Sequence, residues 1–274
     1  MPELPEVETI VRDLRPRLVG RRLAGVQVSG HALRRQWSDD WGPRLVGRRV
    51  REVGRRGKWI LLGLDRQLHL VIHLGMTGQL TVVLRRQPLA DHTHVVVDLD
   101  RGREQLRFRD VRRFGSATLF AEAEQLDRFF RQTGLGPEPF DLDAGYWSTR
   151  LAATSRCLKA VLLDQRVVAG VGNIYADESL YEARLHPARP GKDTSAADAA
   201  RLRRAVVAVL RRAIDKRGSS IRDYVGGSGA RGQFQHEFQV YGRPGHPCPR
   251  CRRPIQRIRL GGRCTHFCPQ CQRL

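Results

Sequence analysis

The stretch Cys248-Pro249-Arg250-Cys251, separated by sixteen residues from Cys268-Pro269-Gln270-Cys271, decides the fold of the C-terminal part of the chain. Two Cys-x-x-Cys turns at this separation are typical of a ribbon whose four thiolates bind one tetrahedral Zn²⁺. The apolar residues between the turns, followed by Gly261-Gly262, predict a β-hairpin. Four protein ligands leave no position for water, so the zinc ion is expected to be structural. The other two cysteines, Cys157 and Cys264, are interpreted as ordinary thiols.

Two disulfides are the alternative reading of the four clustered cysteines. The N-terminal sequence is acidic and lacks the basic and apolar regions of a secretion signal, which argues against an oxidising compartment. No apolar run reaches the roughly 18 residues that a membrane-spanning helix needs. We therefore expect a cytoplasmic protein without a membrane partner.

The composition indicates a globular protein with a polyanionic partner. Among 274 residues there are 49 Lys and Arg against 28 Asp and Glu, which gives a formal net charge of +21. With 41% hydrophobic residues the chain is not mostly disordered. Only four of the basic residues are lysines, namely Lys58, Lys159, Lys192 and Lys216. Since Lys can lose its proton and Arg cannot, a retained Lys points weakly to a role in chemistry, with chance retention on the surface as the alternative.

The chain changes its pattern twice. Apolar spacing predicts a helix from Pro5 to Arg15 that Pro16 ends. Between Leu23 and Phe120, roughly eight short strand-like runs predict a two-sheet sandwich or a barrel. Two glycines and two prolines in Gly134–Pro139 indicate a linker, and helical patterns follow at 146–154, 157–163, 174–183 and 195–216.

We therefore predict an α+β, multidomain protein. Its parts are an N-terminal β-sandwich with an N-terminal helix at 1–133, a linker at 134–149, a helical domain at 150–225, a Gly-rich connection at 226–237 and a C-terminal β-hairpin zinc finger at 238–274.

Five motifs, taken together, identify a family that the chain resembles. The motifs are Met1-Pro-Glu-Leu-Pro-Glu-Val-Glu-Thr9, His73-Leu-Gly-Met-Thr-Gly78, Arg112-Arg-Phe-Gly115, Gly170-Val-Gly-Asn-Ile-Tyr175 and the zinc ribbon. In this order they resemble bacterial formamidopyrimidine-DNA glycosylase, the 8-oxoguanine DNA glycosylase/AP lyase of the Fpg/Nei family. The resemblance covers essentially the whole chain and implies a helix-two-turn-helix fold for the helical domain.

The resemblance implies that Pro2, exposed by removal of Met1, is the nucleophile that forms a Schiff base with the damaged sugar. A terminal amine has an ordinary pKa of about 8, far below that of Lys, so more of it is unprotonated at neutral pH. Glu3 is implied in acid–base work, and Glu6 in relaying protons or orienting the amine. The alternative is that the prolines only shape the chain entry and the glutamates balance the helix dipole.

Two basic residues match the residues that the family uses for β,δ-elimination. Lys58 matches the lysine near the elimination and phosphate site, and Arg263 matches the zinc-finger arginine that grips phosphate. The alternative for Arg263 is a solvent-facing residue of the hairpin.

Seven further residues match the family's DNA contacts. Met76, Arg112 and Phe114 match the residues that fill the vacated stack, with Arg112 placed to bind the orphaned cytosine. His73, Lys159 and Asn173 match backbone contacts, and His92 matches a further DNA contact with which nearby His94 can be confused. Viewed alone, Met76 and Phe114 would more often be core residues.

The loop 221–232 matches the region that caps the everted base, and it departs from the family's pattern at Gln233, where an aromatic is common. The expected partner is damaged double-stranded DNA bound by a monomer, in the bacterial cytoplasm and in association with the nucleoid. Two alternatives remain open: an endonuclease VIII-like glycosylase for oxidised pyrimidines and a catalytically silent DNA-binding protein.

Overall fold

The computed structural model describes residues 2–220 and 226–274, and these form two compact units. The first unit comprises residues up to Gln132 together with Lys216–Gln233, and the second comprises Thr133–Asp215 together with Phe234–Leu274. The second unit therefore contains both the helices that follow residue 133 and the zinc segment.

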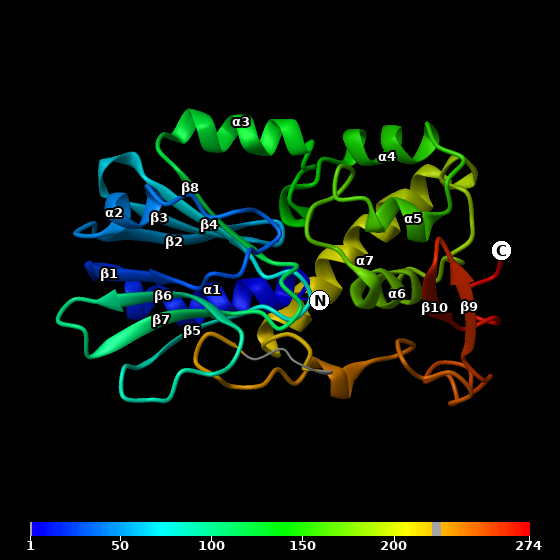
Figure 1. Cartoon of the computed structure of the whole chain (residues 1–274). Helices are drawn as coiled ribbons and strands as arrows, with labels where there is room; N and C mark the ends of the chain where they lie inside the picture. Colours follow the sequence, from blue (N-terminus) through cyan, green and yellow to red (C-terminus); the bar gives the residue numbers. More distant parts are fainter. Residues whose placement is uncertain (1, 221–225) are drawn as a thin grey trace. The chain divides into compact units, whose positions relative to one another are not determined.

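The first unit is built on two four-stranded antiparallel sheets that face one another, as predicted (Figure 1). One sheet has the order β1-β6-β7-β5 and the other the order β2-β3-β4-β8. The strands are β1 Leu23–Val28, β2 Val50–Arg56, β3 Trp59–Leu64, β4 His69–His73, β5 Gln79–Leu84, β6 Thr93–Leu99, β7 Glu104–Arg109 and β8 Ser116–Phe120. Short helices at α2 (Trp41–Leu45) and η1 (Asp65–Gln67) lie in the connections.

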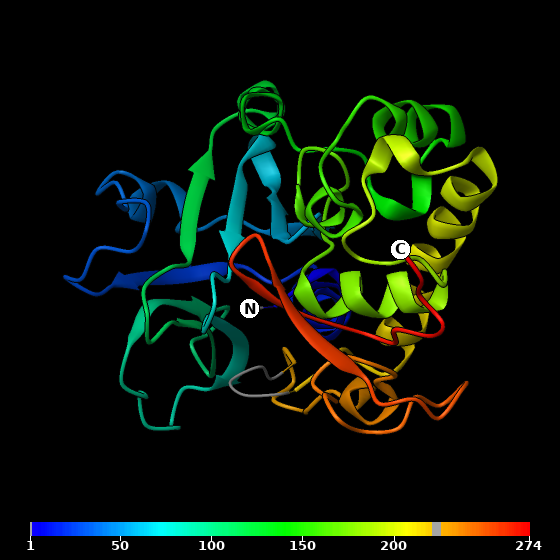
Figure 2. The same ribbon diagram turned by 90° about the vertical axis from the view of Figure 1, so that its right-hand side faces the viewer.

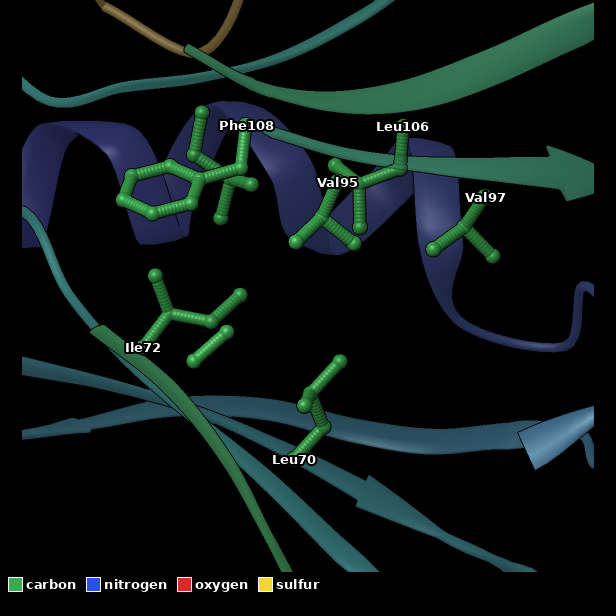
Figure 3. Close-up of a pocket in the computed structure, with 8 residues that line it drawn as sticks. Leu70, Ile72, Val95, Val97, Leu106 and Phe108 are labelled. Carbon is green, nitrogen blue, oxygen red and sulfur yellow. The ribbon is translucent and has the colours of Figure 1, made fainter. Parts of the chain in front are cut away.

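Apolar side chains fill the space between the sheets. Figure 3 shows Leu70 and Ile72 of β4 facing Phe108 and its neighbours on β6 and β7. A cavity of about 10 Å³ lies among them, and every residue that lines it is apolar. That volume holds at most one water molecule, so this cavity is a feature of core packing and not a ligand site.

The N-terminal helix α1 (Leu4–Leu18) buries its apolar face in the same core, and Val7, Ile10 and Leu14 are fully buried. The prediction that Pro16 ends this helix is wrong. The helix continues to Leu18 and Pro16 lies in its last turn, with Val19 donating its backbone N–H to the Arg15 carbonyl.

Helix α3 (Ala123–Thr133), which was not predicted, covers the outer face of the β2-β3-β4-β8 sheet. Its residues Leu126 and Phe129 pack with Val71 of β4 and with the partly buried Trp59 of β3. The i, i+3, i+4 spacing of Leu126, Phe129 and Phe130 is the pattern in the sequence that could have predicted this helix.

The second unit is helical, and its helices begin and end within two residues of the predicted bounds. They are α4 Ala144–Ala152, α5 Leu158–Leu163, α6 Asn173–Glu182 and α7 Ala196–Asp215, with short turns at η2 (Pro139–Asp141), η3 (Gly191–Asp193) and η4 (Phe234–Glu237). The predicted linker at 134–149 contains η2 and most of α4, and it buries Leu142 and Trp147 in this core. These residues therefore fold as part of the helical unit, because their apolar side chains have a core to enter.

The predicted zinc hairpin is present in the same unit. Strands β9 (Gln256–Leu260) and β10 (Arg263–Phe267) pair antiparallel, and the two residues between them, Gly261 and Gly262, both have positive φ. Such two-residue connections need backbone conformations that glycine adopts without strain. Figure 2 shows β10 lying beside α6.

Candidate functional site

Two buried carboxylates lie at the N-terminus of α1, directly after Pro2, which is itself buried. Glu3 is the N-cap residue, and its side chain and that of Glu6 form a capping box, with the Glu3 backbone N–H donating to Glu6 Oε2 at 2.8 Å. The other oxygen of Glu6 accepts the backbone N–H of Ser219 at 2.7 Å. Glu6 therefore ties the start of the chain to the segment that returns to this unit after α7.

The segment around Gly218 approaches Glu6 so closely that no side chain fits there. Gly218 has a φ of +72°, and a Cβ atom on it would lie 2.7 Å from Glu6 Oε1. Both the backbone conformation and the close contact require glycine.

Lys58 and His73 lie at one end of the β2-β3-β4-β8 sheet. Lys58 occupies the turn between β2 and β3 and is only 7% exposed, while His73 ends β4, pairs with Trp59 and packs its ring 4.6 Å from that indole. Burial, followed by the positive charges of Lys58 and Arg34, lowers the pKa of His73 to about 4. His73 is therefore neutral near pH 7.

The hydrogen bonding of His73 determines which ring nitrogen carries the proton. The backbone N–H of Gly75 donates to Nδ1 at 3.1 Å, so the neutral ring carries its proton on Nε2. His73 thus offers an uncharged N–H donor, which suits a phosphate oxygen.

Met76, Arg112 and Phe114 form one exposed cluster on the first unit. Met76 lies in the turn between β4 and β5 and Phe114 in the turn between β7 and β8, and they are 40% and 44% exposed. The Arg112 guanidinium contacts Met76 Sδ at 3.2 Å and stacks over the Phe114 ring at 4.6 Å. Large apolar side chains that cluster at the surface do not contribute to the core, and such clusters are typical of a binding surface.

Asp110, which was not among the predicted site residues, lies beneath this cluster and is 0% exposed. Its carboxylate accepts the hydroxyl of Thr77 and the backbone N–H groups of Arg112 at 3.3 Å and Gly115 at 2.7 Å. The sequence feature that could have pointed to Asp110 is its position just before the motif Arg112-Arg-Phe-Gly115.

The structure separates His92 from His94. His92 is exposed, with a φ of +63°, whereas His94 is 2% exposed and hydrogen-bonded through both ring nitrogens, to Ser29 and to the Asp110 carbonyl. Of the two, only His92 is placed to meet a partner molecule.

In the second unit, Asn173 begins α6 and Lys159 lies against it. Asn173 Nδ2 donates to the carbonyl of Cys264 on β10 at 3.0 Å. Lys159 is 0% exposed, and its ammonium binds the Asn173 carbonyl at 3.2 Å and the buried carboxylate of Asp177. The contact of Lys159 with DNA stays a prediction, and the bonds present make it a support for the start of α6.

Asp177, which the sequence analysis also missed, extends this network to the zinc hairpin. It accepts the backbone N–H of His266 at 3.0 Å and the His266 Nδ1–H at 3.1 Å. Arg263 is exposed at the first position of the same strand β10. The two predicted phosphate-binding groups, Asn173 and Arg263, therefore stand on elements that are bonded together.

The next residue of α6 binds the segment that leads into the zinc finger. Glu178 accepts the backbone N–H groups of Gln239, Val240 and Tyr241 at 2.9 to 3.1 Å. Burial raises the pKa of this carboxyl, although the three hydrogen bonds oppose the rise. Consecutive carboxylates on α6 thus hold the segment entering the finger and the strand leaving it.

The four predicted zinc ligands converge. The sulfur atoms of Cys248, Cys251, Cys268 and Cys271 all lie within 4.8 Å of one another. Such a set of four thiolates fits one tetrahedral Zn²⁺, and these residues form the zinc site of the protein. Cys264 is exposed on β10, and Cys157 is partly buried at the start of α5.

Part of the predicted capping loop is anchored to α1. The Asp13 carboxylate binds the Arg217 guanidinium at 2.7 Å and accepts the Ser228 hydroxyl at 3.0 Å and its backbone N–H at 3.2 Å. Residues 221–225, which carry the rest of that prediction, lie outside the described residues.

Three family models match the chain in order. The model described as the formamidopyrimidine-DNA glycosylase N-terminal domain matches residues 1–117, and the model for the H2TH domain of that enzyme matches 135–225. A model described as the zinc finger found in FPG and IleRS matches 245–274.

Named proteins and solved structures agree with these models. The chain is 50% identical to the formamidopyrimidine-DNA glycosylase of Moorella thermoacetica, over 94% of this chain and 95% of that protein. It is 44% identical to the enzyme of Geobacillus kaustophilus over the whole of both chains. The Lactococcus lactis Fpg bound to DNA with an abasic site matches with a TM-score of 0.92 and 34% identity, over 99% of this chain and 100% of that one. A variant of it bound to DNA containing Fapy-dG matches with a TM-score of 0.93 and 34% identity, over 100% of both chains.

Among the described residues, none of the helices combines the length and the apolar character needed to cross a membrane.

Proposed function

The chain belongs to the formamidopyrimidine-DNA glycosylase family, and from this membership we propose that it excises oxidised purines from duplex DNA and then cleaves the strand. The substrates are 8-oxoguanine and formamidopyrimidines. The observation that carries the proposal is the pair of buried carboxylates of Glu3 and Glu6, which lie directly after Pro2 and each accept the backbone N–H of the other residue.

In the first step, the secondary amine of Pro2, freed by removal of Met1, attacks C1′ of the damaged nucleotide. The C1′–N bond breaks and its electron pair leaves with the base, whose protonation Glu3 assists. The Pro2 nitrogen loses its one proton, and its electron pair then expels O4′ from C1′, so that the sugar ring opens and O4′ takes up a proton, again with the assistance of Glu3. Because the nitrogen of a secondary amine has no second proton to lose, the ring-opened product is a charged iminium. Glu6, with one oxygen bound to each of two backbone N–H groups, keeps the start of α1 in place.

In the later steps the iminium acts as the electron sink. Loss of a C2′ proton expels the 3′ phosphate, and a second elimination expels the 5′ phosphate. Lys58 and Arg263 bind the phosphates near these positions, and His73 adds its neutral Nε2–H donor. Hydrolysis of the final imine then returns the free Pro2 amine.

The exposed cluster of Met76, Arg112 and Phe114 supports a role in eversion of the target nucleotide. An everted base leaves a hole in the stack, which a flexible Met side chain and an aromatic wedge can fill. Arg112 then hydrogen-bonds the base left opposite, with cytosine as the preferred partner.

Asn173, His92 and Arg263 are proposed to bind the DNA backbone, with the zinc ion holding the hairpin that presents Arg263. Lys159 is fully buried, so its proposed role is to support the start of α6 and thereby Asn173. The charge of +21 supplies sequence-independent attraction to duplex DNA. We propose that the protein acts as a monomer in the bacterial cytoplasm, at the nucleoid.

The decisive experiment compares the wild-type protein with Pro2→Gly on duplexes that carry 8-oxoguanine opposite each of the four bases. We expect the wild type to excise the base fastest opposite cytosine and to be trapped covalently by borohydride, with Pro2 identified by mass spectrometry as the attached residue. Undiminished trapping of Pro2→Gly would refute the assignment of the nucleophile. Faster cleavage of thymine glycol than of 8-oxoguanine would favour the endonuclease VIII-like alternative, and no cleavage by a zinc-loaded sample with mature N-terminus would favour the silent DNA-binding protein.

A further inference from the structure

The exposed side chains Met76, Arg112 and Phe114 come from two separate turns of the first unit. Met76 precedes Thr77 in the turn between β4 and β5, while Arg112 and Phe114 follow Asp110 in the turn between β7 and β8. Their contacts with one another are an exposed Arg–Met contact and a cation–π contact, both of which are weak in water. Something beneath the surface must therefore hold the two turns in register.

The bond between the partly exposed Thr77 and the buried Asp110 links the two turns. The Thr77 hydroxyl donates to Asp110 Oδ1, and its oxygen accepts the backbone N–H of Arg112 at 3.1 Å. One hydroxyl group thus bridges the carboxylate and the backbone of the residue that is proposed to read the opposite base. Because Asp110 is 0% exposed, water does not substitute for a lost partner there.

The backbone around this link leaves little freedom. A Cβ atom on Gly75 would lie 2.5 Å from the backbone N of Gly115, and one on Gly115 would lie 3.0 Å from Asp110 Oδ2. The two turns therefore touch through their backbones, and Asp110 also holds the Gly115 N–H at 2.7 Å. A shift of the Arg112 backbone is restrained on one side by this contact and on the other by Thr77.

We propose that Thr77 and Asp110 are positioning residues for opposite-base selection, in that their bond fixes the Arg112 backbone and so the direction of its guanidinium. This inference rests on the proposed reading role of Arg112. Neither residue touches the reacting atoms, so their loss changes selectivity between opposite bases more than it changes the chemistry at Pro2.

The test uses Thr77→Val, which keeps the shape of the side chain and removes the hydroxyl, with Thr77→Ser as the conservative variant that restores it. Thr81→Val, the same change four residues further along in β5, is the matched control. Single-turnover excision rates are measured on 8-oxoguanine opposite cytosine and opposite adenine, together with the melting temperature of each variant. We expect the ratio of the two rates to fall about tenfold in Thr77→Val and to stay near the wild-type value in Thr77→Ser and Thr81→Val.

Arg112→Ala, measured in parallel, separates the inference from the proposed function. If Arg112→Ala loses discrimination and Thr77→Val keeps it, the positioning role is refuted while the reading role of Arg112 stands. If both variants keep the wild-type ratio, the proposed role of Arg112 in reading the opposite base is refuted, and the positioning role of Thr77 and Asp110 is refuted with it. Equal loss in Thr77→Val and Thr77→Ser would also overturn the inference, because the hydroxyl would then be irrelevant.

Discussion

The carboxylate of Asp177 on α6 binds His266 on β10 twice, through the backbone N–H at 3.0 Å and through Nδ1–H at 3.1 Å, while its other oxygen holds the buried ammonium of Lys159. The Asp177 and Lys159 side chains are 0% and 1% exposed. A charged pair at this depth depends on both partners, because removing either leaves a buried charge uncompensated. This network connects the start of α6 to the strand that carries Arg263.

Asp177→Asn is expected to lower the free energy of unfolding by about 3 kcal/mol, because the Lys159 ammonium stays buried without its counter-charge. Urea unfolding at pH 7 measures the loss. Asp198→Asn is the control: Asp198 pairs with Arg189 and Arg201 nearer the surface, where ion pairs contribute about 1 kcal/mol or less. An equal decrease in the free energy of unfolding in the two variants would show that the buried ion pair stabilises the protein no more than a surface ion pair does.

Gly218→Ala is expected to destabilise the protein by about 2 kcal/mol and to slow borohydride trapping at Pro2. The added methyl group would collide with Glu6 Oε1, which accepts the Ser219 N–H, and would displace the carboxylate whose other oxygen binds the Glu3 N–H at the start of α1. The residue would also keep a positive φ. Gly20→Ala separates the two effects, since Gly20 has a φ of +86° and open space around it. We expect Gly20→Ala to lose stability without slower trapping, and slower trapping in both variants would contradict the role given to the Glu6 contact.

The low pKa of His73 predicts a pH-dependent contribution to stability. His73 titrates near 4 in the folded protein and near its ordinary value of about 6.5 in the unfolded chain, so the unfolded state binds more protons between these values. Protonation of His73 therefore has no effect on the free energy of unfolding above about pH 6.5. As the pH falls from 6.5 toward 4, the free energy of unfolding decreases by up to about 3 kcal/mol.

His73→Gln measures this contribution, since Gln retains an acceptor for the Gly75 N–H but does not titrate. The stability difference between wild type and His73→Gln is expected to shift against the wild type as the pH is lowered from 7 to 4, in denaturant unfolding at each pH. A difference that is independent of pH would refute the lowered pKa.

Zinc removal is expected to unfold the β9–β10 hairpin and to abolish strand cleavage, because Arg263 then loses its fixed place. A chelator should release one zinc ion per chain, measured with a colorimetric dye, with loss of DNA binding in the same titration. Cys268→Ser is expected to lose zinc in the same way. Cys264→Ser, in the same strand but outside the sulfur cluster, should keep one zinc ion and full activity, and zinc loss from that variant would place Cys264 in the site.

Local sequence patterns were sufficient for much of the fold. The helices of the second unit and the eight strands of the sandwich follow from apolar periodicity, which reflects burial of one face. The zinc site follows from the spacing of two Cys-x-x-Cys turns, since each turn brings its own two sulfurs together whatever the rest of the chain does. The N-terminal motif likewise placed Pro2, Glu3 and Glu6 within two turns of helix.

The tertiary structure alone decided which distant groups meet. Asp110 and Thr77 are 33 residues apart, and Asp177 and His266 are 89 apart, and neither pair forms a recognisable local pattern. Apart from its positive φ, Gly218 must be glycine because Glu6, more than 200 residues earlier in the chain, packs directly against it. The sequence by itself thus determined most of the secondary structure, the zinc ligands and the family of the chemistry, because these depend on short spacings. The partners of the buried carboxylates that orient the exposed residues were determined by packing. A hydrogen bond between segments distant in the sequence forms only once the core has brought them together.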